Sequence, residues 1–77
     1  MIMAVSPANI AVGDFYVCFT EVREVISVAR SGDVTFLARS RTDVVGRESM
    51  TLETRSRELF AVEVDRRVGP SYRMPRS

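Results

Sequence analysis

The stretch EVREVISVARSGDVTFLARS, residues 21–40, contains the clearest structural pattern in the chain. Two runs rich in valine, isoleucine and phenylalanine flank a centre made of Ser31, Gly32 and Asp33. Glycine adopts positive φ readily and an aspartate side chain bonds the nearby backbone, so this centre has the chemistry of a tight turn. Residues 21–40 therefore predict an antiparallel β-hairpin.

Alternation within the two runs predicts which side chains share a face. In the first run, Val22, Ile26 and Val28 fall on one side of the strand. Arg23 and Val25 fall on the other side, which is wetter. The apolar side of the second run consists of Val34, Phe36 and Ala38. We expect the apolar sides to face a common core.

The segment VGDFYVCF, residues 12–19, precedes the hairpin and predicts a further strand that begins at Ile10. Both of its faces are largely apolar, as in a closed or covered sheet. Gly13-Asp14 predicts a turn or bulge at the strand entrance. A thiol becomes a nucleophile beside a cation or a helix N-terminus, so Cys18, at a core position, is interpreted as a small buried hydrophobe.

The C-terminal half is less regular. Residues 41–46 read as a loop and residues 47–52 as a fourth strand near an edge, where charged side chains discourage unwanted pairing. Residues 53–66 fit two structures, because period-two alternation favours a strand whereas Thr51 or Thr54 would cap a helix. ETRSRE lacks Gly, Asn or Pro for a hairpin turn, and this favours the helix.

These elements together look like a mainly β fold, a small SH3-like antiparallel barrel of four to five strands closed by a short C-terminal helix. A single barrel domain is expected over residues 10–68, between an N-terminal extension at 1–9 and a flexible tail at 69–77. The expected core consists of Val12, Phe15, Val17, Phe19, Ile26, Val28, Phe36 and Phe60.

The succession VGDFYV, VREVISV, GDVTFLAR and LETRSRELFA resembles short orphan proteins of phages and mobile elements, including integron gene cassettes. The likeness covers residues 10–66. It implies a compact β domain closed by a C-terminal helix, without a settled activity. Arg55 departs from this pattern, because such proteins place an apolar helix residue there.

The composition excludes several catalytic chemistries for the isolated chain. The 77 residues include no histidine and one cysteine, so neither a Ser-His-Asp or Cys-His arrangement nor a four-ligand Cys/His zinc site can form. The four glycines are dispersed and form no phosphate-binding loop. We therefore expect no catalytic, metal-binding or cofactor-binding residues and a non-enzymatic function.

Arginine is the sole basic residue type, although the net charge is only +1. Arginine suits bidentate phosphate or carboxylate recognition, and a GC-rich coding sequence explains the same usage. Most arginines follow Ala38, and the candidate binding residues are Arg39, Arg41, Arg47, Arg66, Arg67 and Tyr72. Alternatively, Arg39 and Arg47 pair with Glu48 or Asp43 and the tail is solubilising.

Two functions remain open. The preferred one is a small interaction module of a phage or mobile genetic element that binds a host protein or itself, which the low net charge favours. The alternative is an SH3-like nucleic-acid-binding domain with an arginine-rich face, whose affinity is weak because carboxylates are interspersed. Surplus apolar surface on the first strand predicts a homodimer. The start MIMAV lacks a basic flank and a long apolar run, so we expect no membrane segment and a cytoplasmic location.

Overall fold

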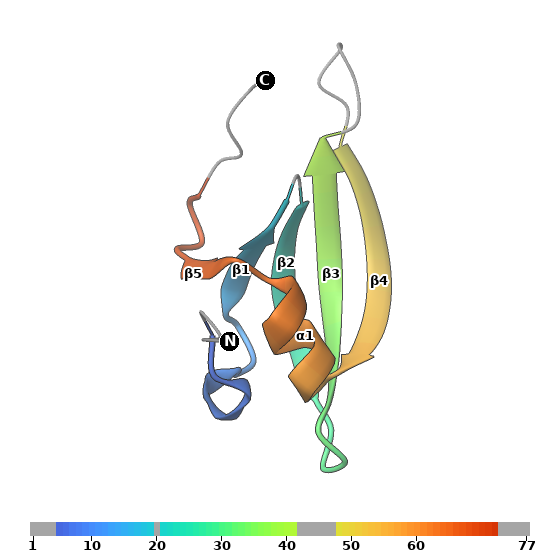
Figure 1. Cartoon of the computed structure of the whole chain (residues 1–77). Helices are drawn as coiled ribbons and strands as arrows, with labels where there is room; N and C mark the ends of the chain where they lie inside the picture. The colour runs from blue at the N-terminus through green and yellow to red at the C-terminus, as the bar shows by residue number, and fades with distance from the viewer. Residues whose placement is uncertain (1–4, 20, 42–47, 73–77) are drawn as a thin grey trace.

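The computed structural model describes residues 5–19, 21–41 and 48–72, with backbone alone at positions 40, 41, 48 and 49. Its elements are η1 (Pro7–Asn9), β1 (Phe15–Cys18), β2 (Glu21–Val28), β3 (Asp33–Arg41), β4 (Glu48–Ser56), α1 (Arg57–Glu63) and β5 (Arg66–Val68). The five strands form one antiparallel sheet in the order β4-β3-β2-β1-β5, and α1 covers one face of it (Figure 1). We call the face under α1 the inner face and the opposite one the outer face.

The mainly β class is confirmed, and within the described residues the sheet is open. Among the described residues, each of the outermost strands, β4 and β5, pairs with a neighbour along one side only. The helix α1 connects these two strands in the chain and packs against β3 and β4 on the way.

The predicted hairpin is confirmed as β2 and β3. Val28 pairs with Val34, and the Ala29 N–H donates to the Asp33 carbonyl oxygen at 2.9 Å to close the turn. Gly32 has a φ of +96°, a conformation that glycine adopts at little cost. The turn residues therefore act as the sequence indicates.

A β-bulge in β2 changes which residues face the core. Val25 pairs with Phe36 and Ser27 with Thr35, which leaves Ile26 as an extra residue between them. Arg23 and Val25 consequently point to the inner face before the bulge and Val28 does so after it. The prediction that Arg23 and Val25 lie on the wetter side is wrong, because the bulge interrupts the alternation of β2.

The first strand is shorter than predicted. The turn at Gly13-Asp14 is confirmed, since the Asp14 N–H donates to the Ala11 carbonyl oxygen at 3.1 Å, and β1 starts only at Phe15. Val12 precedes the strand and Phe19 follows it, with 63% and 84% of their surfaces exposed. These two residues are wrongly predicted as core, as are Ile26 at the bulge and Phe15, which is half-buried and lies outside the core cluster.

Residues 53–66 contain three structures in succession. They include the end of β4, the whole of α1, and Arg66 at the start of β5, so the predicted helix is confirmed. Its cap is Ser56, whose Oγ accepts the Leu59 N–H at 3.2 Å, rather than Thr51 or Thr54. The edge position predicted for the fourth strand is confirmed too.

The core lies between α1 and the inner face. Phe36 and Phe60 are fully buried, and Tyr16 is 1% exposed. The Phe60 ring meets Tyr16 and Phe36 edge-on, with centroid distances of 5.4 and 5.1 Å. Val5 belongs to the predicted extension, yet it is buried in this core. Of the predicted tail, residues 73–77 lie outside the described part of the chain.

Candidate functional site

The outer face carries two rows of side chains that cross all five strands. The strand registers define both rows, because directly opposed residues point to the same side of a sheet. One row contains Val68, Phe15, Glu24, Leu37 and Leu52. The other contains Arg66, Val17, Val22, Arg39 and Met50. Apolar side chains therefore outnumber charged ones on this face.

The exposure of the apolar side chains in the two rows increases from β1 toward β4. Val17 is buried, Leu37 and Val22 are half-buried, and Met50 and Leu52 are 56% and 66% exposed. The described helices η1 and α1 pack against each other, and α1 and the residues that flank η1, Val5 and Ile10, belong to the core on the inner side. Within residues 5–19, 21–41 and 48–72, the outer face is therefore uncovered by any helix.

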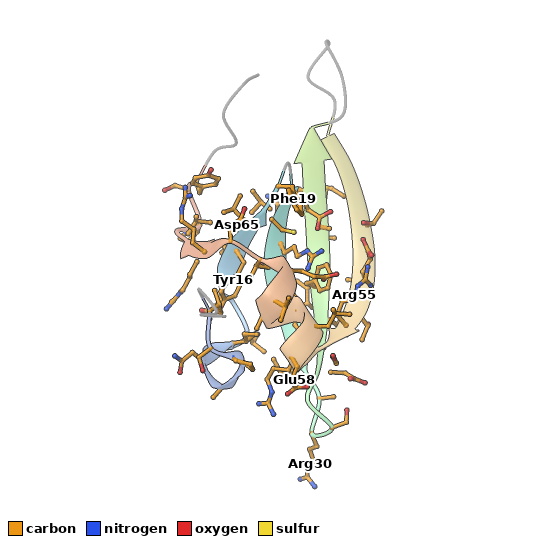
Figure 2. The ribbon with its side chains drawn as sticks, viewed as in Figure 1. Tyr16, Phe19, Arg30, Arg55, Glu58 and Asp65 are labelled. Carbon is orange, nitrogen blue, oxygen red and sulfur yellow. The ribbon has the colours of Figure 1, made fainter. Side chains whose placement is uncertain are left out.

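Phe19 is a further exposed apolar residue, at the turn that joins β1 to β2 (Figure 2). It has a φ of 55°, which is unusual for a bulky side chain. Its N–H donates to Asp65 Oδ2 at 3.4 Å, and its side chain stays in solvent. The backbone thus holds an aromatic ring outward at a conformational cost.

Phe19→Asn should raise the free energy of unfolding by up to about 1 kcal/mol, because asparagine tolerates left-handed backbone better than phenylalanine does. Little burial is lost, since the ring is exposed. Urea unfolding followed by circular dichroism measures the change, with Phe15→Asn inside β1 as the control that should lower stability. A lower midpoint for Phe19→Asn would mean that the ring stabilises the monomer.

The candidate arginines are dispersed over the sheet. Arg39 pairs with Glu24 at 3.4 Å on the outer face, and Arg67 pairs with Asp14 at 3.2 Å. The Arg66 guanidinium lies 5.7 Å from the centroid of the Tyr72 ring, so these two residues come together. β1 and β2 separate Arg66 from Arg39, a distance of roughly 14 Å at the usual strand spacing. The Arg41 side chain and all of Arg47 lie outside the described residues.

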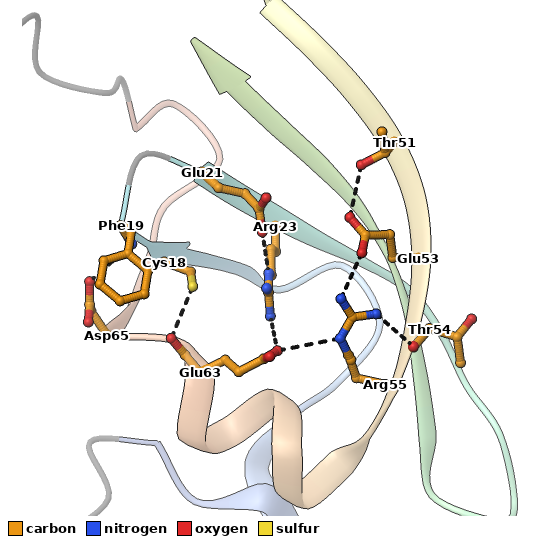
Figure 3. A network of polar contacts seen from close by, with 10 residues as sticks. All are labelled: Cys18, Phe19, Glu21, Arg23, Thr51, Glu53, Thr54, Arg55, Glu63 and Asp65. Carbon is orange, nitrogen blue, oxygen red and sulfur yellow. Dashed lines mark hydrogen bonds and ion pairs between the residues drawn. The ribbon is translucent and has the colours of Figure 1, made fainter. Parts of the chain in front are cut away.

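A charged network connects β2, β4 and α1 on the inner face (Figure 3). Arg23, which is 6% exposed, donates from Nε to Glu21 Oε2 at 2.5 Å and from Nη1 to Glu63 Oε1 at 2.8 Å. Arg55 Nη2 donates to Glu53 Oε1 at 2.8 Å, and its Nε lies 3.8 Å from Glu63 Oε1. The network holds the end of α1 against the sheet.

The pKa shifts of Arg23 and Glu53 favour the ionised form of each of these two groups. Burial opposes the charge on Arg23, but hydrogen bonds to Glu21 and Glu63 outweigh it and raise the pKa of Arg23. Hydrogen bonds from Thr51 and Arg55 lower the pKa of Glu53. Arg23 and Glu53 are therefore suited to a structural role rather than to proton transfer.

The thiol of Cys18 has the environment of a structural cysteine. It is buried, and its Sγ donates to the Glu63 carbonyl oxygen at 3.0 Å. Burial is the main cause of the raised pKa of this thiol, so the reactive thiolate is disfavoured. The prediction that Cys18 is a small buried residue is confirmed.

Tyr16 is the second buried ionisable group in β1. Its hydroxyl donates to Asp14 Oδ2 at 3.1 Å. Burial above all, and the Asp14 contact next, raise the pKa of Tyr16 to about 12.

The stability of the protein should therefore fall as the pH rises from about 10 to about 12. The folded state holds the Tyr16 proton more tightly than the unfolded chain does. The stabilisation that results is complete below the pKa of Tyr16 in the unfolded chain, and it is lost as the pH rises through the pKa in the folded state. Urea unfolding across this pH range measures it. Tyr16→Phe should have a flatter pH dependence, and parallel curves for the two proteins would contradict the assignment.

Described residues include no group of three or more His, Cys, Asp or Glu side chains that could hold a metal ion. No helix in the same residues is long and apolar enough to cross a membrane. Comparisons with protein-family models, curated proteins and solved structures found no match.

Sequence patterns did not predict the outer-face rows. Leu37 and Leu52 belong to strands that the alternation identified, but their apposition depends on the register between β3 and β4. Arg23 was missed because the bulge lacks a glycine or another local marker. The exposed apolar positions of residues 47–52 were the available signal for the outer face.

Proposed function

We propose that the chain is a non-enzymatic interaction module that binds a partner protein, or a second copy of itself, through the outer face. The observation that carries the proposal is the exposure of Leu52 and Met50 at 66% and 56%, at the end of two rows that are largely apolar. Single exposed apolar residues are ordinary, whereas contiguous ones are typical of interaction sites. Covering them would release about 25 cal/mol for each Å² of apolar surface.

Two other features support binding at this face. The ion pair between Glu24 and Arg39 lies among the apolar side chains and would fix the orientation of a partner. Phe19 offers a large aromatic ring at the end of the adjoining hairpin, and aromatic residues are frequent among those that dominate binding energy. The outer face thus combines apolar area, an ion pair and a nearby aromatic residue.

Site-specific photo-cross-linking in the native host tests the proposal. A photoreactive phenylalanine analogue replaces Leu37, which is half-buried at the middle of the outer face. The matched control places the same analogue at Glu58, which is exposed on α1. We expect a discrete protein adduct from position 37 and none of the same mass from position 58.

Equal adducts from both positions, or none from position 37, would contradict the proposal. Circular dichroism of both variants establishes that each is folded. A reconstituted complex with the adducted protein should lose at least tenfold in affinity on Leu37→Asp, because a buried unpaired carboxylate costs more than about 1.4 kcal/mol.

Nucleic-acid binding is the second proposal, and the approach of Arg66 to Tyr72 favours it. Such a pair suits stacking on an unpaired base beside a phosphate. The ion pairs of Arg39 with Glu24 and of Arg67 with Asp14 reduce the free positive charge, so we expect weak binding that falls with salt. A salt titration with single-stranded oligonucleotides, repeated with Arg66→Ala, measures this contribution.

We further propose that the five strands have the arrangement of a small, incompletely closed SH3-like barrel and that the chain derives from a phage or mobile element. The antiparallel order β4-β3-β2-β1-β5, with α1 between the two edge strands, supports the first proposal. The second rests on the resemblance of residues 10–66. A cytoplasmic location is also proposed, and the free, buried thiol of Cys18 supports it because reduced cysteines are usual there.

A further inference from the structure

The β4 strand is a long edge of the sheet. It spans Glu48–Ser56, nine residues, and pairs with β3 along one side. The opposite edge, β5, has three residues. β4 contains no proline or lysine, which commonly protect exposed edges from pairing, and its charged residues Glu53 and Arg55 pair with each other at 2.8 Å. A long edge of this composition can accept another strand.

Backbone hydrogen bonds determine which residues of β4 face outward. The Val25 N–H donates to Asp14 O and the Val25 carbonyl accepts from the Gly13 N–H, both at 2.9 Å, so Val25 directs its backbone groups toward the β1 side. Adjacent residues of a strand direct these groups to opposite sides, so Glu24 faces β3.

The same alternation extends across β3 to β4, because no bulge interrupts the register there. Glu24 pairs with Leu37, and Phe36 pairs with Glu53. Glu53 therefore bonds to β3, while Leu52 and Thr54 direct their N–H and carbonyl groups away from the sheet. The Thr54 carbonyl agrees with this assignment, because it accepts the side chain of Arg55 at 3.1 Å.

The outward residues of β4 also carry outer-face side chains. Met50 and Leu52 are exposed, and Leu52 lies opposite Leu37 on β3. A second strand that pairs with β4 would consequently extend the outer face as well as the sheet. This links the edge to the surface of the proposed function.

Self-pairing of β4 is compatible with few registers. Residues of β4 that direct their backbone groups away from β3 must lie opposite the same kind of residue in the second copy. The two-fold axis of an antiparallel pair therefore passes through one residue of the strand. An axis at Glu53 would oppose two like charges, which is destabilising. An axis at Thr54 would place Leu52 opposite the partner's Ser56. Residues 48–51 would then lie beyond the end of the partner's β4, beside its α1, and would have no strand to pair with.

An axis at Leu52 avoids both problems. It uses all nine residues of each β4 and places Leu52 opposite the partner's Leu52. Met50 then faces the partner's Thr54, and Thr51 faces the partner's Glu53. No like charges are opposed within the described side chains, and an acceptor carboxylate meets a hydroxyl donor.

We propose that the partner is a second copy of this chain, and that two β4 strands pair antiparallel about a two-fold axis at Leu52. The two sheets become one continuous sheet, and Leu37 and Leu52 of both copies form one apolar row on its outer face. This inference goes beyond the proposed function, because the β4 edge makes the contact and the outer faces of both copies stay open to a further partner. On pairing, the hydrogen bond from Arg55 to the Thr54 carbonyl oxygen is lost, and the bond from Arg55 to Glu53 remains.

Disulfide trapping tests the register. Leu52→Cys should form a covalent dimer under mild oxidation, since opposed residues of paired strands lie within the Cα separation that a disulfide needs, about 4.4–6.8 Å. Thr54→Cys alone should react at least about tenfold more slowly, because two copies of position 54 would be roughly 14 Å apart along the strands. A mixture of Met50→Cys and Thr54→Cys should cross-link. Wild type, whose Cys18 is buried, is the control.

Sedimentation tests the association without a cross-link. Wild type should pass from monomer to dimer with rising concentration. Leu52→Lys opposes two cations and should weaken the dimer at least about tenfold. Leu52→Pro should do the same while the monomer stays folded, because the N–H that it removes faces away from β3.

A wild type that stays monomeric at high micromolar concentration overturns the inference. A dimer in which Leu52→Cys cross-links no faster than Thr54→Cys overturns it too. If Leu37 yields an adduct with a different protein in either case, the proposed function stands without self-pairing. Without that adduct, both proposals fail.

Discussion

Phe36→Ala is expected to lower the free energy of unfolding by roughly 3–5 kcal/mol. Phe36 is fully buried, and its ring packs against Phe60 at a centroid distance of 5.1 Å. Truncation removes this apolar contact and leaves a cavity under α1. A domain of this size has a total stability of only about 5–10 kcal/mol, so the variant should unfold at a much lower urea concentration.

Leu37→Ala is the matched control for this prediction. Leu37 neighbours Phe36 on the same strand but points to the outer face, where it is half-buried. Its truncation should cost about 1 kcal/mol, because less apolar surface returns to water. Equal urea midpoints for the two variants would contradict the assignment of inner and outer faces.

Arg23→Ala should cost roughly 3–5 kcal/mol for an electrostatic reason. The substitution removes the cation that contacts Glu21 at 2.5 Å and Glu63 at 2.8 Å. It also removes a guanidinium that lies 4.5 Å from the Phe36 ring centroid and 5.4 Å from that of Phe60. Two carboxylates then remain near the core without their main partner.

A second variant separates the loss of charge from the loss of packing. Combining Arg23→Met with Glu21→Gln and Glu63→Gln keeps most of the volume and leaves no unpaired carboxylate in the cluster. This triple variant should recover most of the stability lost in Arg23→Ala, as measured by urea unfolding at neutral pH. Equal losses in both proteins would mean that the guanidinium contributes mainly through its contacts with the rings.

The parts of the fold that local chemistry specifies could be predicted from the sequence. The turn at Gly32 and the alternation of Val34, Phe36 and Ala38 were sufficient for β3, because these three side chains are all buried on one face of the strand. The absence of turn residues favoured the helix α1, but the sequence did not identify Ser56 as its N-cap. Serine and threonine residues occur repeatedly nearby, so residue type alone did not select the cap.

The errors come from features that depend on strand pairing. The bulge at Ile26 exchanges the faces of β2 without a glycine or proline to mark it. The brevity of β1 leaves Val12 and Phe19 outside the sheet, although both fit the apolar pattern. In each case the residue type indicates burial, and the tertiary arrangement determines the outcome.

The candidate site was less predictable than the fold. Sequence reasoning selected arginines, and the structure places Arg39 and Arg67 in ion pairs with Glu24 and Asp14. The outer-face rows combine residues from five strands, so they exist only once the registers are known. Periodicity identifies the two faces of one strand, but it does not identify which residues of different strands become neighbours.

The bulge in β2 also affects how the chain tolerates changes in length. Deleting Ile26 would join Val25 to Ser27 and restore regular alternation, with Val25 and Val28 still on the inner face. A deletion inside β3, which has no bulge relative to β4, would turn every following side chain to the wrong face. Evolutionary gain or loss of a single residue in this sheet should therefore be accommodated at position 26, and homologues that differ in length there can share the same core.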